Sequence, residues 1–117
     1  MKHVDYVSKI QECFVKREEV LKRGQSISLY NKWYDKMIVC KQKIFEENRQ
    51  SELVSQLYSE SASIRYDVAC ILFHHYPDLC TQVLREIADM TFENGMPKYL
   101  AIISTGARCT LEYGIPL

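Results

Sequence analysis

The sequence SESASIRYDVACILFHHYP, residues 59–77, decides the fold that we expect for this chain. Small hydroxyl residues open the stretch, an apolar run follows, and Pro77 closes it. Serine at the start and proline at the end are common boundary signals of a helix. The stretch therefore predicts a helix over about Ser63 to His75, and nothing in it indicates catalytic chemistry.

The predicted helix has apolar residues on two sides. One side is made at helical spacing by Ile64, Val68, Ile71, Leu72 and His75. The other side is made by Tyr66, Ala69, Cys70 and Phe73. A helix that is apolar all round is either covered from two directions or presents an apolar face to a partner. The side with Tyr66 and Phe73 is thus a candidate partner-binding surface, and the sequence leaves its exposure open.

Outside this stretch the chain also favours helices. Only four glycines and three prolines interrupt 117 residues, which argues against the many tight turns of a β protein. Five further helices are expected over 5–22, from Ser26 or Ser28 to about Gln50, over 51–58, from Pro77, and over about 98–111. The fold class that we predict is all-α, with one domain spanning residues 1–117.

Six helices can form a compact stack of three antiparallel pairs, first with second, third with fourth and fifth with sixth. The predicted second helix carries Tyr34 within its apolar stripe, and the third is expected to bury Leu53, Val54, Leu57 and Tyr58. Gly106 falls inside the last helix, where glycine costs about 1 kcal/mol relative to alanine. Close packing of a neighbouring helix at Gly106 would compensate for that cost.

Residues 52–76 resemble a HEAT repeat, a helix pair whose second helix begins with an Ile/Val-Arg-x-x-Ala pattern. The matching residues are Leu53-Val54-x-x-Leu57 and, after a short turn, Ser63-Ile64-Arg65-x-x-Val68-Ala69-x-x-Leu72. The whole chain looks like a family of small bacterial HEAT-like domains, and similar small helical proteins serve as immunity proteins of bacterial toxin systems. The resemblance implies a HEAT-like alpha-alpha superhelix that contacts a partner protein and has no catalytic residue.

Charge is balanced overall but unevenly distributed. Residues 1–50 contain eleven Lys or Arg against seven Asp or Glu, and residues 51–117 contain four against eight. The acidic half includes Glu86, Asp89 and Glu93 on the expected outer face of the fifth helix. This pattern is typical of the solvated face of an amphipathic helix, and it could also steer a basic partner such as a toxin domain. The alternative is a nucleic-acid-associated module that uses the basic half, but interleaved glutamates argue against a continuous basic patch.

No residue pattern indicates an enzyme, a cofactor or a metal site. The five cysteines lack Cys-x-x-Cys spacing, which favours free thiols in a reducing cytoplasm over zinc ligation or disulfides. His74 and His75 are adjacent, so on a helix their side chains point about 100° apart and do not easily coordinate the same metal ion. His75 is expected in the core. No apolar run is long enough for a membrane span, and the partner and oligomeric state stay open.

Overall fold

A computed structural model describes residues 4–90 and 96–116 of the chain. Throughout these two ranges the regular structure is helical and no strand occurs, so the all-α prediction is confirmed there. The chain divides into two compact units, Met1–Leu53 and Val54–Leu117. The prediction of one domain over residues 1–117 stays a prediction.

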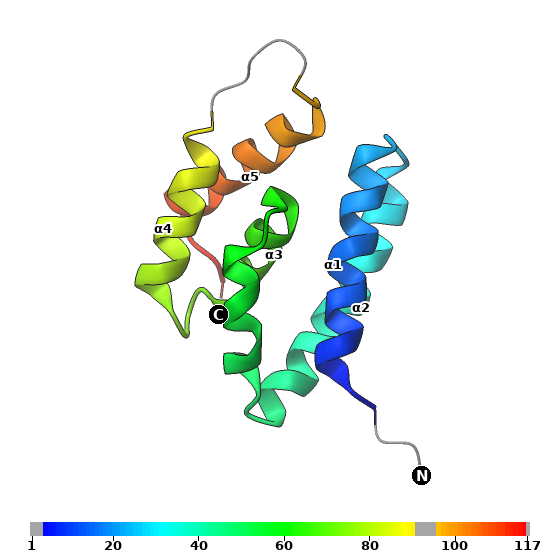
Figure 1. The fold of residues 1–117 in the computed structure, drawn as a ribbon, viewed down its shortest axis with the longest axis vertical. Coiled ribbons are helices and arrows are strands. Elements are labelled where there is room, and N and C mark those ends of the chain that lie inside the picture. The colour runs from blue at the N-terminus through cyan, green and yellow to red at the C-terminus, as the bar shows by residue number, and fades with distance from the viewer. Residues whose placement is uncertain (1–3, 91–95, 117) are drawn as a thin grey trace. The chain divides into compact units, whose positions relative to one another are not determined.

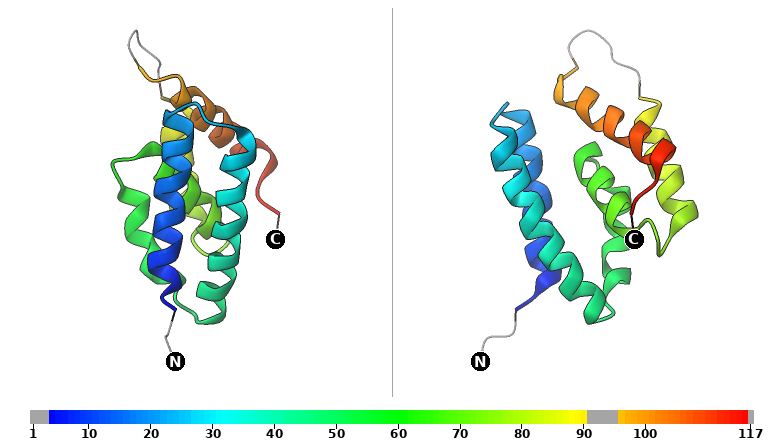
Figure 2. Two further views of the ribbon diagram at one scale, coloured as in Figure 1. Left: turned by 90° about the vertical axis from the view of Figure 1, so that its right-hand side faces the viewer. Right: turned by 180° about the vertical axis from the view of Figure 1, so that it is seen from behind.

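The first unit is built on a hairpin of two long helices, α1 (Tyr6–Lys22) and α2 (Ile27–Glu46), which pack antiparallel (Figures 1 and 2). Gly24 makes the turn between them with φ of 62°, the left-handed conformation that glycine adopts at little cost. Its N–H donates to the carbonyl of Leu21 at 3.2 Å. The predicted first pair is therefore confirmed.

The second helix ends earlier than the sequence pattern suggests. Asn48 takes φ of 56°, and the Arg49 N–H donates to the carbonyl of Ile44 at 2.9 Å. This is the hydrogen-bond pattern that closes a helix at a left-handed residue, which is most often glycine and sometimes asparagine. The chain then enters η1 (Gln50–Tyr58), which is a 3-10 helix and matches the short third helix that we expected.

The second unit contains α3 (Ala62–Leu72), α4 (Pro77–Ala88) and α5 (Tyr99–Tyr113). All three pack against one another, and the predicted pairing of the last two helices is confirmed. Ser61 caps α3, because its Oγ accepts a hydrogen bond from the Ile64 N–H at 3.1 Å. Pro77 opens α4 at a position where its missing N–H costs no hydrogen bond.

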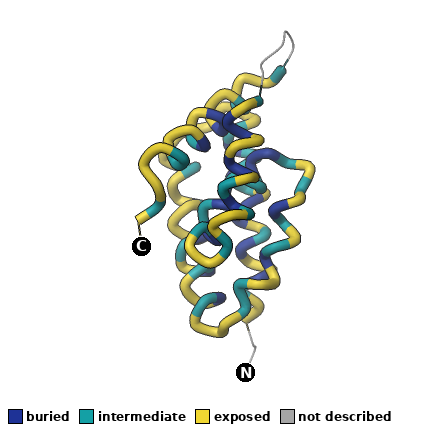
Figure 3. Tube along the Cα trace, turned by 90° about the vertical axis from the view of Figure 1, so that its left-hand side faces the viewer, coloured by how far each residue is buried: buried dark blue, intermediate teal, exposed yellow. Residues whose placement is uncertain are grey.

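Buried positions recur along each helix among exposed ones (Figure 3). In α4 the inward residues are those that the sequence predicts, namely Cys80, Val83, Leu84, Ile87 and Ala88. Leu53 and Leu57 of η1 are also buried, as expected. The amphipathic pattern of α4 alone therefore sufficed to identify its core side.

Three predicted core positions are wrong. Tyr58, the last residue of η1, is 70% exposed, whereas its neighbour Leu57 is buried. Tyr34 is 44% exposed at the edge of the hairpin. His75 is exposed because α3 ends at Leu72, so His75 lies in the turn that follows and not on the helical stripe.

Gly106 packs closely against α3, as its place inside a helix predicted. A Cβ atom built on Gly106 would come within 2.8 Å of the Tyr66 hydroxyl oxygen. Carbon and oxygen atoms do not approach that closely without a shift, so only glycine leaves room for the ring where it lies.

None of the helices in the described ranges combines the length and the apolar character that crossing a membrane requires.

Candidate functional site

The predicted partner-binding residues lie in the second unit, on two helices that pack together. Tyr66 lies in α3 and Phe73 is its C-cap, whereas Glu86 lies in α4 and Asp89 is its C-cap. Glu93 lies outside the described residues.

The aromatic part of this surface is partly covered. Tyr66 is half-buried, and its ring contacts the backbone of α5 at Gly106. Phe73 is also half-buried and meets the His74 ring edge-on, with 5.6 Å between ring centroids. Tyr66 thus has a packing role within the unit, and only part of the apolar side that the sequence predicted is available to a partner.

The acidic part is open to solvent. Glu86 and Asp89 are exposed, and neither carboxylate forms an ion pair with any residue that the structure describes. They stand three residues apart, so they are neighbours on the same helical face. Asp89 also occupies the C-cap of α4, where the partial negative charge of the helix end disfavours a carboxylate.

The end of α4 is held to α5 by two hydrogen bonds to one carbonyl. Ser104 Oγ and Arg108 Nε donate to the Ala88 oxygen at 3.2 Å and 3.1 Å. These bonds satisfy a carbonyl that has no partner within its own helix, and they fix the last turn of α4 in place. Asp89 therefore follows a turn that is hydrogen-bonded to α5.

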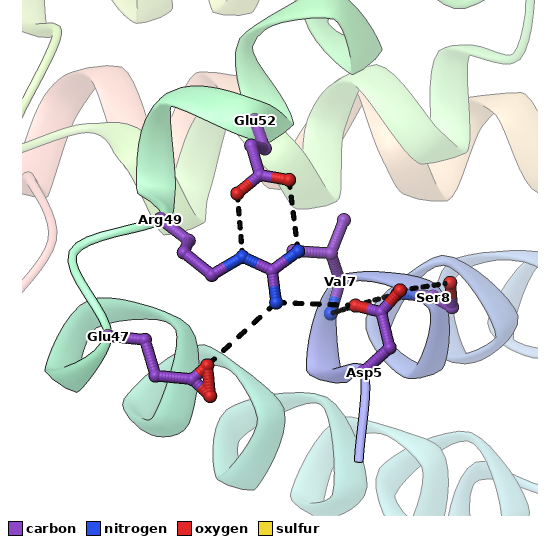
Figure 4. Close-up of polar contacts among 6 residues, drawn as sticks. All are labelled: Asp5, Val7, Ser8, Glu47, Arg49 and Glu52. Atoms are coloured by element: carbon purple, nitrogen blue, oxygen red, sulfur yellow. Dashed lines mark hydrogen bonds and ion pairs between the residues drawn. The ribbon is translucent and has the colours of Figure 1, made fainter. Parts of the chain in front are cut away.

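In the first unit, Arg49 joins three carboxylates (Figure 4). Its Nε and Nη2 donate to the two oxygens of Glu52 at 2.6 Å and 3.0 Å, and its Nη1 lies 3.4 Å from Asp5 and 3.8 Å from Glu47. Hydrogen bonding from Ser8, together with the Arg49 charge, holds the pKa of Asp5 below its ordinary value. Arg49 likewise lowers the pKa of Glu52, chiefly by hydrogen bonding.

This cluster ties the N-cap of α1 to the start of η1, and its role is structural. Sequence reasoning missed it. The available signals were Asn48, which ends α2 just before Arg49, and the three-residue spacing from Arg49 to Glu52.

Arg17 is a buried cation that the sequence analysis also missed. Its guanidinium carbon lies 4.0 Å from the ring centroid of Tyr30 and 5.3 Å from that of Tyr34. Its Nη1 contacts the sulfur of Met37 at 3.7 Å. Stacking on aromatic faces lets an arginine lie between two helices. The contact with Arg17 gives the Tyr34 ring a role at the edge of the hairpin, outside the core.

A pocket of about 350 Å³ opens between α1 and α2 within the first unit. Its apolar walls come from Tyr6, Trp33 and Val39, and its charged groups from Lys9, Glu12 and Lys36. The thiols of Cys13 and Cys40 also line it, and both are buried. No sequence signal predicted this pocket, because its walls combine residues that are about 25 positions apart.

The two thiols are both buried and are poor nucleophiles. Burial raises the pKa of Cys13 to about 11, and it also raises the pKa of Cys40. A thiol that stays protonated at neutral pH does not supply the thiolate that nucleophilic catalysis needs. Both cysteines therefore behave as small core residues.

The described part of the chain has no group of three or more His, Cys, Asp or Glu side chains that could hold a metal ion. His74 instead bonds the chain end, with its Nε2 2.7 Å from the Ile115 carbonyl oxygen. Comparisons of the sequence and structure with models of protein families, with curated proteins and with solved structures gave no match.

Proposed function

We propose that this chain is a non-catalytic protein-protein interaction module with a HEAT-like helical architecture. In its most concrete form it is an immunity-type protein that binds and blocks a toxin with a basic surface. The observation that carries the proposal is the pair of exposed carboxylates, Glu86 and Asp89, which have no basic partner among the described residues.

Two features make this pair costly for the free protein. Like charges three residues apart on a helix repel each other, and Asp89 is opposed by the dipole of α4. A basic partner removes both costs on binding, and its approach is favoured by the charge of the whole unit. Residues 54–117 contain seven Asp or Glu against four Lys or Arg, a net charge of −3.

The HEAT-like part of the proposal is supported by the packing of sequence neighbours. Helix α1 packs with α2, and α4 packs with α5, as in folds built from successive helix pairs. Tyr66 and Phe73, in α3 and at its C-cap, are half-buried, and aromatic residues are enriched in protein interfaces.

A protein partner is favoured over a nucleic acid because several cations of the basic half, residues 1–50, are already engaged by carboxylates. Three lysines of α1 and α2 form ion pairs with glutamates one helical turn away: Lys16 with Glu19, Lys22 with Glu18, and Lys43 with Glu46. Arg49 is engaged by three carboxylates. Phosphate binding would have to compete with these contacts.

The test is affinity capture from the native host with the wild-type chain and with two charge-reversal variants. Glu86→Lys/Asp89→Lys reverses the proposed binding carboxylates. Glu60→Lys/Glu112→Lys is the matched control, because it makes the same change in net charge at two other exposed carboxylates of the second unit.

We expect a basic protein to be captured by the wild type and by the control variant, and to be lost with Glu86→Lys/Asp89→Lys. Equal capture by all three proteins would overturn the role of these carboxylates. Retention of the wild type on DNA or RNA that falls steeply with salt would instead support the nucleic-acid alternative.

A further inference from the structure

We propose that the pocket between α1 and α2 binds a small molecule that carries an anionic group on a flat apolar body. The pocket lies wholly in the first unit, so this inference does not depend on the proposed function of the second.

The first argument is the state of the two pocket lysines. Lys9 and Lys36 form no ion pair with a described residue. Three other lysines of the same helices each form an ion pair with a glutamate, namely Lys16, Lys22 and Lys43. Among the residues that line the pocket, Glu12 is the one opposing charge. Two ammonium groups against one carboxylate leave a net positive charge at the opening, which favours an anionic group.

The second argument is the position of the Lys36 ammonium group over an aromatic face. Its Nζ lies 4.4 Å from the ring centroid of Trp33, within the range of a cation–π contact. An anionic group that binds Lys36 is therefore next to an aromatic surface. A ligand can satisfy both at once if its charge is attached directly to a ring.

The third argument is the rest of the wall. Val39 is 54% exposed at the pocket, and Tyr6 and Trp33 are half-buried, so apolar surface is open to solvent there. The buried thiols at Cys13 and Cys40 add a polarizable surface without a charge that would repel an anion. Few polar groups on a mainly apolar lining are typical of small-molecule sites.

The size of the pocket limits the ligand. A volume of about 350 Å³ is at the lower end of the range for small-molecule sites. It suits a body of one or two rings and excludes a large cofactor. Aromatic carboxylates are the simplest compounds that combine this size, flatness and charge.

The chain provides its own reporter for a test, because Trp33 is its single tryptophan and therefore gives the one indole N–H signal in an NMR spectrum. The probe is 2-naphthoate, titrated into the full-length protein. The matched ligand control is 2-naphthylmethylamine, which has the same rings and the opposite charge.

We expect the Trp33 indole signal to shift saturably with 2-naphthoate and at least about tenfold more weakly with the amine. Lys9→Gln and Lys36→Gln should each weaken naphthoate binding several-fold, and the double variant should weaken it further. Lys22→Gln is the control for losing a lysine of α1 outside the pocket, and it should bind like the wild type.

Three results would overturn the proposal. These are no saturable shift with naphthoate, equal binding of the amine, and wild-type affinity in the double variant. The comparison of the two ligands uses the unaltered chain, so it decides the matter even if a variant folds poorly.

Discussion

Gly106 and Tyr66 show how one pair of residues sets the distance between two helices. The ring of Tyr66 fills the space that a side chain at position 106 would need. The glycine costs helix stability, and the close approach of α3 to α5 compensates for it. Both residues are therefore needed for the packing of the second unit.

Gly106→Ala should destabilise the wild-type protein by about 1 kcal/mol. The new methyl group displaces the Tyr66 ring, and the free-energy cost of that displacement exceeds the gain from the higher helix propensity of alanine. In a Tyr66→Ala background the clash is gone, and the same change should stabilise by about 1 kcal/mol. Urea denaturation of the four proteins measures this coupling. The same effect of Gly106→Ala in both backgrounds would contradict the contact.

Cys80 illustrates a residue whose chemistry follows from burial alone. It is fully buried in α4, and burial raises the pKa of its thiol from 9.0 to about 11. In the unfolded chain the thiol loses its proton above pH 9, whereas in the folded chain it keeps the proton until about pH 11. The resulting stabilisation is complete below pH 9 and disappears as the pH rises to 11.

Between pH 9 and pH 11 the free energy of unfolding of the wild type should therefore fall more than that of Cys80→Ala, by up to about 3 kcal/mol. Lysines and tyrosines titrate in both proteins, so their effects cancel in the difference. Cys109→Ala, at an exposed cysteine, is the control and should follow the wild type. Parallel pH profiles for wild type and Cys80→Ala would refute the burial argument.

Among the helix boundaries, those marked by glycine or proline could be predicted from sequence, whereas the ends of α2 and α3 could not. Caps and turns are local, so Gly24 and Pro77 mark the ends of helices where the sequence pattern placed them. The sequence left two candidates for the start of α2, and the structure selects Ser26, whose Oγ accepts from the Leu29 N–H at 3.2 Å.

Ser26→Ala should therefore destabilise the protein by about 1 kcal/mol through the loss of the α2 cap. Ser28→Ala is the matched control, because Ser28 lies inside the first turn of α2 and is also exposed. Alanine favours the helix, so Ser28→Ala should be neutral or slightly stabilising. Thermal unfolding of the three proteins gives the answer, and a larger loss for Ser28→Ala would show that the cap is misassigned.

Features that depend on packing between distant segments were not accessible from sequence. The Arg49 cluster joins residues from position 5 to position 52, and the pocket lies between two separate helices. His75 was misplaced for a related reason, since apolar periodicity continues past Leu72 although the helix does not. For the candidate site, the exposed carboxylates Glu86 and Asp89 followed from periodicity, but the covering of Tyr66 by α5 did not.

At the scale of the whole molecule, the two units differ in charge and in the kind of site that they offer. The first unit has eleven Lys or Arg against eight Asp or Glu, and many of these charges are paired within the unit. The second has a net charge of −3 and exposed carboxylates without a basic partner among its described residues. A small molecule in the first unit and a basic protein on the second are separate expectations with separate tests.

The proposed function depends most on the binding of a basic partner protein by Glu86 and Asp89. The most direct measurement is isothermal titration calorimetry of the purified partner with the wild type, with Glu86→Lys/Asp89→Lys and with Glu60→Lys/Glu112→Lys. We predict that reversal at 86 and 89 weakens the affinity at least about tenfold, whereas the control variant binds like the wild type. Equal affinities for all three proteins would contradict the claim.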